Sequence, residues 1–209
     1  MPLFYQHTIN DSTRLAVWHI TEDESFFEGV AHISRQVTHP HKRLQHLAGR
    51  FLLTLLSPNF PIDEIEINTY KKPFLPGNGI RFSISHCGDY AAAIVSNKYR
   101  VGIDVEGVTH KIQRVKERFL TPYELHLLEE EKLLSQSDKL HTLFWSAKEA
   151  IYKWHGNGPL SFKNNMGMDR LHYLDEEGRI EAHFTQGERI ELLVNFRFFD
   201  DLCLAWLLQ

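Results

Sequence analysis

Short apolar stretches separated by turn-forming residues run through most of the chain, and they predict strands. Two prolines and two glycines mark residues 71–79 as a turn region. The chain closes with the apolar run LCLAWLL at residues 202–208. The predicted strands are 14–20, two short strands within 81–96 around a turn at 87–89, 101–106, and several pieces from Met168 onward with turns at Glu177-Gly178 and Gln186-Gly187.

Three other stretches are predicted to be helical: 42–56, a charged run at 122–134, and 139–155. The first helix ends at Ser57-Pro58, and GNGP at 156–159 stops the third. Helix 42–56 is amphipathic when its residues are placed 100° apart around a wheel. Its predicted apolar face is Leu44, Leu47, Ala48, Phe51, Leu52 and Leu55, and its polar face is Lys42, Arg43, His46 and Arg50.

The segments 44–53 and 143–152 form a faint internal repeat. Both are amphipathic helices, and each is followed by a turn-rich stretch and then by apolar strands. The repeat favours an α+β fold of two similar lobes that meet at a central cleft, a common place for a ligand. The expected lobes are residues 1–100 and 101–209.

Composition excludes several classes of protein. Of the 209 residues, 43% are hydrophobic and 24% charged, which is typical of globular proteins and unlike disordered or collagen-like chains. A formal charge of −4 is not that of a general nucleic-acid binder. Cys87 and Cys203 form no C-x-x-C pair, which favours a reducing compartment. Without a signal-peptide pattern or about 18 uninterrupted apolar residues, we expect a soluble, cytoplasmic protein with no membrane partner.

The strand 101–106, VGIDVE, places two carboxylates on one face. Side chains alternate along a strand, so Val101, Ile103 and Val105 point into a core while Asp104 and Glu106 point the other way. The two carboxylates repel each other unless a cation lies between them, and such hard oxygen ligands suit Mg²⁺ or Mn²⁺. The alternative is a solvated edge strand with two surface acids.

Helix 139–155 adds a third carboxylate with basic and aromatic neighbours. Tryptophan on a polar face favours a helix that faces a ligand over a purely solvated one, although ordinary helix electrostatics is the alternative. Three acids and two lysines suit a metal-bound pyrophosphate. One arc holds Trp145, Lys148, Glu149, Tyr152 and Lys153, and the predicted core arc holds Leu143, Phe144, Ala147, Ala150, Ile151 and Trp154.

Ser85 and His86 lie at the end of a predicted strand beside Gly88. A hydroxyl, an imidazole and backbone N–H groups can hydrogen-bond a phosphate. A Ser-His hydrolase pair is the alternative, but no G-x-S-x-G surrounds Ser85, and neighbours in a strand point to opposite faces.

Five motifs follow one another in an ordered set: KP at 72–73, SISH at 83–86, GIDVE at 102–106, RFLTPYE at 118–124 and FWSAKEAIYK at 144–153. The set resembles the 4′-phosphopantetheinyl transferases of the surfactin-synthetase-activating type. The combination of GIDVE with WSAKEA at this separation is specific, unlike either motif alone. The resemblance spans roughly residues 42–158, and the tail agrees in pattern only.

The resemblance implies a pseudo-dimer in which each lobe is a small, mostly antiparallel sheet packed against a long helix, with the site between the lobes. It implies a monomeric enzyme that takes coenzyme A, Mg²⁺ and an apo acyl carrier or peptidyl carrier protein. Such enzymes transfer the 4′-phosphopantetheine arm to a carrier serine and release 3′,5′-ADP. The nucleophile belongs to the carrier, so no activated serine or cysteine is expected in this chain.

The matching motifs also imply residue roles. Asp104, Glu106 and Glu149 would bind the metal, and Glu149 or a water that it holds would take the proton from the serine hydroxyl. Lys153 and Lys148 would neutralise charge on the pyrophosphate.

For coenzyme A, the resemblance implies that Lys72-Pro73, Ser85 and His86 hold the phosphoadenosine portion, with His86 on the 3′-phosphate. Family members commonly place basic residues ahead of the first helix to reach that phosphate, and the sequence departs from this pattern. Residues 26–43 offer only Arg35, Lys42 and Arg43. Arg43 and Arg50 are carried over, with an alignment that is ambiguous by one residue.

Two other function classes are alternatives to the transferase. A metal-dependent nuclease could use the same acids, but position 108, where the commonest such fold has lysine, is Val108, and the net charge is wrong for a DNA-binding surface. A relative that binds coenzyme A or carriers without turnover is disfavoured by the intact acids. The sequence leaves open which class of carrier protein is the acceptor.

Overall fold

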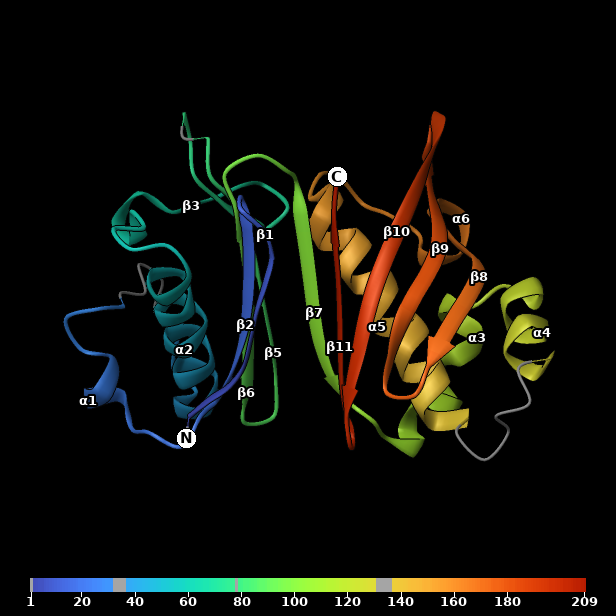
Figure 1. Ribbon diagram of the computed structural model, residues 1–209, viewed down its shortest axis with the longest axis horizontal. Helices are drawn as coiled ribbons and strands as arrows, with labels where there is room; N and C mark the ends of the chain where they lie inside the picture. The colour runs from blue at the N-terminus through green and yellow to red at the C-terminus, as the bar shows by residue number, and fades with distance from the viewer. Residues whose placement is uncertain (1, 32–36, 78, 131–136) are drawn as a thin grey trace.

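The computed structural model describes residues 2–31, 37–77, 79–130 and 137–209, and it combines antiparallel sheets with helices (Figure 1). The predicted mixture of helices and antiparallel strands is confirmed. A four-stranded sheet has the order β1-β2-β6-β5, and a five-stranded sheet has the order β7-β11-β10-β9-β8. The strands are β1 (Leu3–Asn10), β2 (Thr13–His19), β3 (Glu66–Ile67), β4 (Pro73–Phe74), β5 (Arg81–Cys87), β6 (Tyr90–Ser96), β7 (Val101–Gly107), β8 (Met166–Leu174), β9 (Glu177–Gln186), β10 (Glu188–Phe199) and β11 (Leu202–Leu208).

One long helix packs against each sheet. The α-helices are α1 (Glu24–Phe27), α2 (Pro40–Leu56), α3 (Lys116–Phe119), α4 (Pro122–Glu130), α5 (Ser137–His155) and α6 (Phe162–Asn165), and two short 3₁₀ helices are η1 (Ile62–Glu64) and η2 (His110–Arg114). Pro40 opens α2, where its missing N–H costs nothing, and the His39 side chain accepts from the Lys42 N–H.

The sheets pack face to face between the two helices. Along β2, Ala16 and Trp18 face the core under α2, whereas Leu15 and Val17 face the second sheet. The same alternation directs Ile103 of β7 into the layer between the sheets. The order of layers is therefore helix, sheet, sheet, helix (Figure 1).

The second sheet and α5 approach each other closely at one glycine. A Cβ atom on Gly102 would lie 2.0 Å from the carbonyl oxygen of Ala150 and 2.8 Å from the Trp154 nitrogen, so only glycine fits there without a shift. The predicted core arc of this helix is confirmed, because its apolar residues are all buried; they are Leu143, Phe144, Ala147, Ala150, Ile151 and Trp154.

The predicted apolar face of α2 is confirmed except at Leu55, because Leu47, Ala48 and Leu52 are buried and Leu44 and Phe51 pack against the same core. Leu55 is 39% exposed, while Leu53 and Leu56 are buried, and Arg50 from the predicted polar face is 9% exposed. The reason is that β5 lies directly against Gly49, where a Cβ would be 2.5 Å from Ile84 Cγ2. That approach rotates the covered face of the helix toward residue 49.

Two other boundaries differ from the prediction. Glu177-Gly178 lies inside β9, and the turn comes earlier, where Asp175 takes the left-handed conformation with a φ of 53°. The turn at Gln186-Gly187 is confirmed, since β9 ends at Gln186 and Gly187 has a φ of 98°. Of the helix predicted at 122–134, α4 covers Pro122–Glu130, and the remainder lies outside the described residues.

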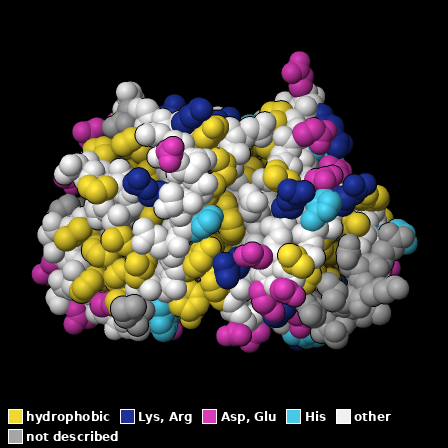
Figure 2. All heavy atoms as spheres, in the orientation of Figure 1, with side chains coloured by type: hydrophobic (Ala, Val, Ile, Leu, Met, Phe, Trp, Pro, Cys, Tyr) yellow, Lys and Arg dark blue, Asp and Glu magenta, His cyan; other side chains and the backbone are white. Residues whose placement is uncertain are grey.

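The outer face of the second sheet carries many charged side chains (Figure 2). Asp169, for example, accepts from His183 Nδ1 at 2.7 Å and from Arg189 Nη2 at 3.0 Å. In the described part of the chain, no helix has the length and apolar character to cross a membrane.

Candidate active site

The neighbouring edges of the two sheets, β5 and β7, meet in a seam. Side chains alternate along β5, so Phe82 packs under α2 while Ser83 faces β7. The Ile103 N–H donates to Ser83 Oγ at 3.3 Å, and the Gly107 N–H points at Cys87 Sγ at 3.3 Å. The interpretation of 101–106 as a solvated edge strand is therefore wrong.

Asp104 lies in this seam and is only 2% exposed. Its Oδ1 accepts from Ser85 Oγ at 2.7 Å and from Lys153 Nζ at 2.6 Å, and its Oδ2 accepts from Ser146 Oγ at 2.8 Å. Lys153 also donates to Ser85 Oγ at 2.7 Å. Donors from both β5 and α5 thus fix the carboxylate, as a buried charge requires.

Glu106 and Glu149 lie close enough to Asp104 for its negative charge to raise the pKa of each. Burial, and then the charge of the Asp104 carboxylate, raise the pKa of Glu149 to about 7, although Lys153 acts in the opposite direction. Burial, followed by Asp104, also raises the pKa of Glu106, whose Oε1 accepts from Trp145 Nε1 at 3.4 Å. The cluster is therefore short of positive charge.

This donor set has the chemistry of a divalent-cation site. Three carboxylates that destabilise one another's charged forms gain from a cation, and their hard oxygens suit Mg²⁺ or Mn²⁺. Among the described residues, no three His, Cys, Asp or Glu side chains converge closely enough to form a ready-made ligand group. The chemistry of the donors fits such an ion, and a full coordination sphere is not assembled.

Lys148 does not lie in this cluster. It is 0% exposed, and its Nζ pairs with Glu124 Oε1 at 2.7 Å and donates to the carbonyls of Phe119 at 2.8 Å and Phe162 at 3.0 Å. The prediction that Lys148 faces the ligand is wrong, because it precedes Glu149 on the helix and points about 100° away into the core around α3, α4 and α6. These contacts make Lys148 an anchor for the segment after η2.

Ser85 and His86 separate, as neighbours in a strand must. Ser85 belongs to the carboxylate cluster through Asp104. The His86 ring lies on the α2 side, in edge contact with His46 at 5.2 Å between centroids. Burial lowers the pKa of His86, and Lys153 and then Lys42 lower it further.

A cavity of about 360 Å³ reaches from this cluster toward Lys72-Pro73. Its lining includes Tyr70, Lys72, Pro73, Ser83, Tyr152 and Lys153. Lys153 lines the cavity and also donates to Asp104, so this one side chain links the cavity wall to the carboxylate cluster. The cavity wall therefore brings together the predicted KP motif, Ser83 of β5 and two residues of the predicted α5 arc, Tyr152 and Lys153. The predicted Ser85 is not part of this wall and meets Lys153 beside Asp104.

Comparison with known proteins finds a similarity that covers the second half of the chain. A family model described as the 4′-phosphopantetheinyl transferase superfamily matches residues 100–203. This segment of the chain is therefore similar to that superfamily. It contains the three clustered carboxylates and Lys153, whereas the KP motif, Ser85 and His86 of the transferase-like set lie outside it.

Two curated relatives agree with the superfamily. The chain is 30% identical over 115 residues to enterobactin synthase component D of Salmonella typhi, covering 54% of this chain and 47% of that protein. It is 28% identical over 130 residues to 4′-phosphopantetheinyl transferase HetI of Nostoc sp., covering 57% and 54%. The chain spans about half the length of the curated relatives it matches. The matches support the transferase class that the motifs predicted.

The two arginines carried over from the transferase resemblance lie away from the carboxylate cluster. Arg43 Nε pairs with Glu24 Oε2 at 2.5 Å. Arg50 is nearly buried, and its Nη1 lies 3.5 Å from the His46 carbonyl. Arg35 lies outside the described residues.

Sequence reasoning missed Ser146 and Cys87, which lie beside the carboxylate cluster, and Glu124, which pairs with Lys148 in the core. Ser146 stands inside the WSAKEA motif and three residues before Glu149, a spacing that places both on one side of the helix. Glu124 ends the quoted RFLTPYE motif, and its carboxylate also accepts from the Thr121 N–H at 2.7 Å and the Met168 N–H at 3.0 Å. Cys87 offered no signal, because its contact with the Gly107 N–H depends on the packing of β5 against β7, which belong to different sheets.

Proposed function

We propose that this chain transfers the 4′-phosphopantetheine group of coenzyme A to a serine of an apo acyl carrier or peptidyl carrier protein, with release of 3′,5′-ADP. The observation that carries the proposal is the cluster of Asp104, Glu106 and Glu149 beside Lys153, inside the segment that matches the transferase superfamily. The coenzyme would occupy the cavity that runs from Lys72 to Lys153.

Asp104, Glu106 and Glu149 would hold Mg²⁺, or Mn²⁺ in its place. When bound, the ion would supply positive charge to the pyrophosphate and so favour departure of 3′,5′-ADP. Lys153 holds Asp104 and Ser85 in position, and its ammonium would also face the pyrophosphate.

Proton removal falls to Glu149 or to a water that it holds. Glu149 follows Ser146 by one helical turn and is half-buried beside the cluster, where a carboxylate can accept a proton from an incoming serine. His86 and Lys72-Pro73 would hold the phosphoadenosine portion, with Ser85 at the junction. Arg43 and Arg50 stay predicted contacts of the coenzyme; in the structure Arg43 pairs with Glu24 and Arg50 is nearly buried.

The subtype that we propose is the pseudo-dimeric, surfactin-synthetase-activating one, acting as a monomer in the cytoplasm. Its lobes would be residues 1–100 and 101–209. Two observations support this division. The four-stranded sheet is built from residues 1–100 and the five-stranded sheet from residues 101–209, and one long helix packs against each of these two sheets.

The test is an intact-mass assay of purified apo carrier proteins incubated with coenzyme A and Mg²⁺. A gain of one phosphopantetheine on the carrier, absent without coenzyme A or in excess chelator, is the expected result. Acyl and peptidyl carrier proteins are assayed separately, so that the preferred acceptor emerges from the same experiment. A folded wild-type protein that modifies neither carrier would overturn the proposal.

Glu149→Gln is the matched variant, since it keeps size and removes charge. We expect transfer to fall while coenzyme A binding, measured by calorimetry, stays within about threefold, because the phosphoadenosine contacts persist. Glu188→Gln, at the exposed β9–β10 turn, is the control and should retain full activity.

A further inference from the structure

The loop that joins β3 to β4, residues 68–72, forms part of the wall of the cavity that we assign to coenzyme A. Another part of the wall is the C-terminal end of α5, which belongs to the second half of the chain. The lining residues from these two segments are Tyr70, Lys71 and Lys72 of the loop, and Tyr152, Lys153 and Gly156 at the end of α5. The spacing of the two walls therefore depends on what holds the loop against the helix.

The side chain of Asn68 closes this loop on itself. Its Oδ1 accepts from the N–H groups of Tyr70 and Lys72, each at 2.9 Å, and the Asn68 N–H donates to the Lys72 carbonyl at 3.0 Å. Within the loop, Lys71 takes the left-handed conformation with a φ of 64°, which is unfavourable for a residue other than glycine. Such a conformation persists only where surrounding contacts hold it, and Asn68 supplies contacts on both sides of Lys71.

The same side chain also reaches the second half of the chain. Asn68 Nδ2 donates to the Gly156 carbonyl at 3.1 Å. Gly156 ends α5, since its N–H donates to the Tyr152 carbonyl at 2.9 Å and its φ of 70° is left-handed. Lys72 Nζ from the same loop donates to the Trp154 carbonyl at 3.3 Å. The last carbonyls of a helix have no partners within it, so the loop supplies donors where α5 needs them.

The loop and the end of α5 are in close contact at this junction. A Cβ atom on Gly156 would lie 2.2 Å from Lys72 Cδ and 2.5 Å from Lys72 Nζ. An asparagine amide carries both an acceptor and donors, so Asn68 can close the loop and bind the helix end with one side chain. Its loss would release the loop and the junction together.

We propose that Asn68 is a positioning residue for coenzyme A: it closes the loop 68–72 and fastens it to the end of α5, so that both walls of the cavity are in place before the ligand binds. This inference rests on the proposed function, because that function assigns the cavity to coenzyme A. Asn68 is not one of the lining residues and acts through Lys72 and Gly156, which are. A cavity that is already assembled binds more tightly, because less ordering accompanies binding.

Two neutral variants separate the contacts of Asn68, and neither adds a charge that would repel the phosphates of the ligand. Asn68→Ser keeps an oxygen that can accept from the Tyr70 N–H, but its side chain is too short to reach Gly156. Asn68→Ala removes all of the side-chain contacts. Asn164→Ala is the matched control, because Asn164 is exposed on α6, which packs against β8 and β9. Thermal melts establish that the variants are folded.

NMR of the protein without ligand tests the fastening itself. Loss of the hydrogen bond from Asn68 should move the carbonyl ¹³C signal of Gly156 in both variants and leave it unchanged in the control. The Tyr70 amide hydrogen should exchange about tenfold faster in Asn68→Ala than in the wild type, and at an intermediate rate in Asn68→Ser. An unchanged Gly156 signal in both folded variants would overturn the proposal.

Calorimetry with coenzyme A tests the consequence for the ligand. We expect the Kd to rise about fivefold in Asn68→Ser and about twentyfold in Asn68→Ala, while Asn164→Ala stays within about twofold of the wild type. In transfer assays the KM for coenzyme A should rise by similar factors. The kcat should stay within about twofold, because Asn68 contacts the loop and Gly156 and acts on binding alone.

Three outcomes are decisive for this role. Wild-type affinity in both folded variants would overturn it, and so would a fall in kcat with an unchanged KM, the result expected if Asn68 disturbed the carboxylate cluster instead of the cavity. If the wild-type protein bound no coenzyme A, the proposed function would be contradicted, and with it the role of Asn68 toward that ligand. The Gly156 signal would still decide whether Asn68 fastens the loop, so the two failures are distinguishable.

Discussion

In each half of the molecule an edge strand packs closely against a long helix, and a glycine makes the close contact possible. The glycine belongs to the helix in the first half and to the strand in the second. In the first half the glycine is Gly49 on α2, and the strand contributes the side chain of Ile84. In the second half the glycine is Gly102 on β7, and it meets the backbone of α5 at Ala150. The first contact is between side chain and helix, and the second is between two backbones.

This difference determines which of the two contacts holds buried charged side chains. In the first half, Ile84 covers the approach, and the next residue on that face, His86, rests against His46. In the second half, close approach at Gly102 brings Asp104 beneath α5, within reach of Ser146 and Lys153. One strand–helix contact is mainly apolar, and its counterpart holds buried charge.

The largest effect is expected at the buried charge. Asp104→Asn should lower phosphopantetheine transfer by about 10³-fold or more, because it removes metal affinity and the anchor of Lys153. It should also lower the melting temperature, since Lys153 loses its ionic partner. Mass-spectrometric rates and calorimetric melts measure both. Rates within tenfold of wild type at ordinary Mg²⁺ would show that Asp104 is structural only.

That prediction differs from what the sequence alone suggests. Two acids on one strand face predict a repulsive pair whose loss would leave stability unchanged or raise it. The sequence could place Asp104, Glu106, Glu149 and Lys153 together through their motifs. It could not show that three donors hold Asp104, because those contacts depend on how β5 and α5 pack on β7.

The same limit explains the error at Lys148. Helical periodicity locates a residue within a broad arc, and an arc of five residues spans both the seam and the core behind it. Only the packing of the segment after η2 shows that Lys148 meets Glu124. Strand and helix identities were predictable from local patterns, whereas the turn at Asp175 and the rotation of α2 depended on neighbouring elements.

The two lysines of α5 therefore offer a sharp contrast. Lys148→Met should cost about 3–5 kcal/mol in the free energy of unfolding, because it leaves Glu124 charged and buried. Lys153→Met should cost about 1–2 kcal/mol, since Ser85 and Ser146 still donate to Asp104. Urea denaturation measures both.

Two checks accompany that contrast. The double variant Lys148→Met with Glu124→Gln should recover part of the loss, since no unpaired charge remains. In transfer assays on folded protein the order should reverse, with Lys153→Met the slower enzyme. Equal stability losses for the two single variants would mean that the buried pair is not the anchor we describe.

The paired glycines test the comparison directly. Gly102→Ala should cost about 3 kcal/mol in unfolding free energy, because its Cβ would meet a backbone carbonyl that cannot move without shifting α5. Gly49→Ala should cost about 1–2 kcal/mol, because its Cβ would meet the side chain of Ile84 and no backbone atom, and because alanine favours a helix. Chemical denaturation of both variants provides the values, and a larger loss for Gly49→Ala would invert our account of the two contacts.

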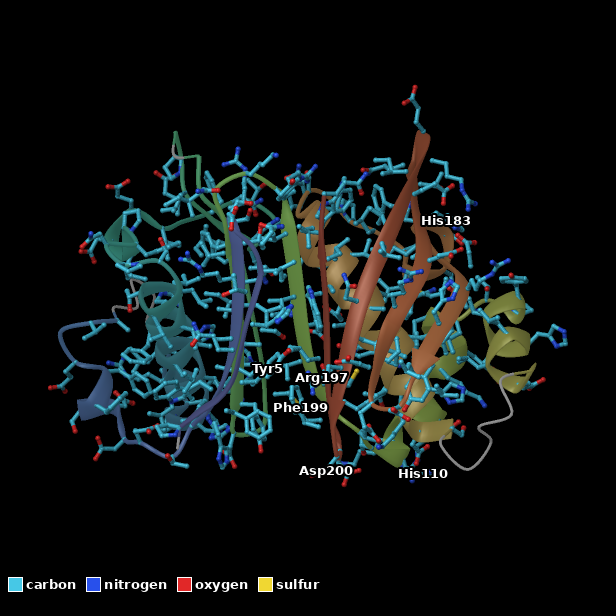
Figure 3. All side chains as sticks on the ribbon, in the orientation of Figure 1. Tyr5, His110, His183, Arg197, Phe199 and Asp200 are labelled. Carbon is cyan, nitrogen blue, oxygen red and sulfur yellow. The ribbon has the colours of Figure 1, made fainter. Side chains whose placement is uncertain are left out.

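The last prediction concerns the first half and its contribution to ligand binding. His86→Ala should weaken coenzyme A by about 1.5–3 kcal/mol, the value of one hydrogen bond to a charged phosphate, and should leave dephospho-coenzyme A nearly unchanged. Calorimetric titration of both ligands makes the comparison. His110→Ala is the matched control, because its imidazole pairs with Asp138 on the surface of the second half (Figure 3). If both ligands weaken equally, His86 supports the strand–helix contact through His46 instead of meeting the 3′-phosphate, and the first half would then contribute no direct contact from that position.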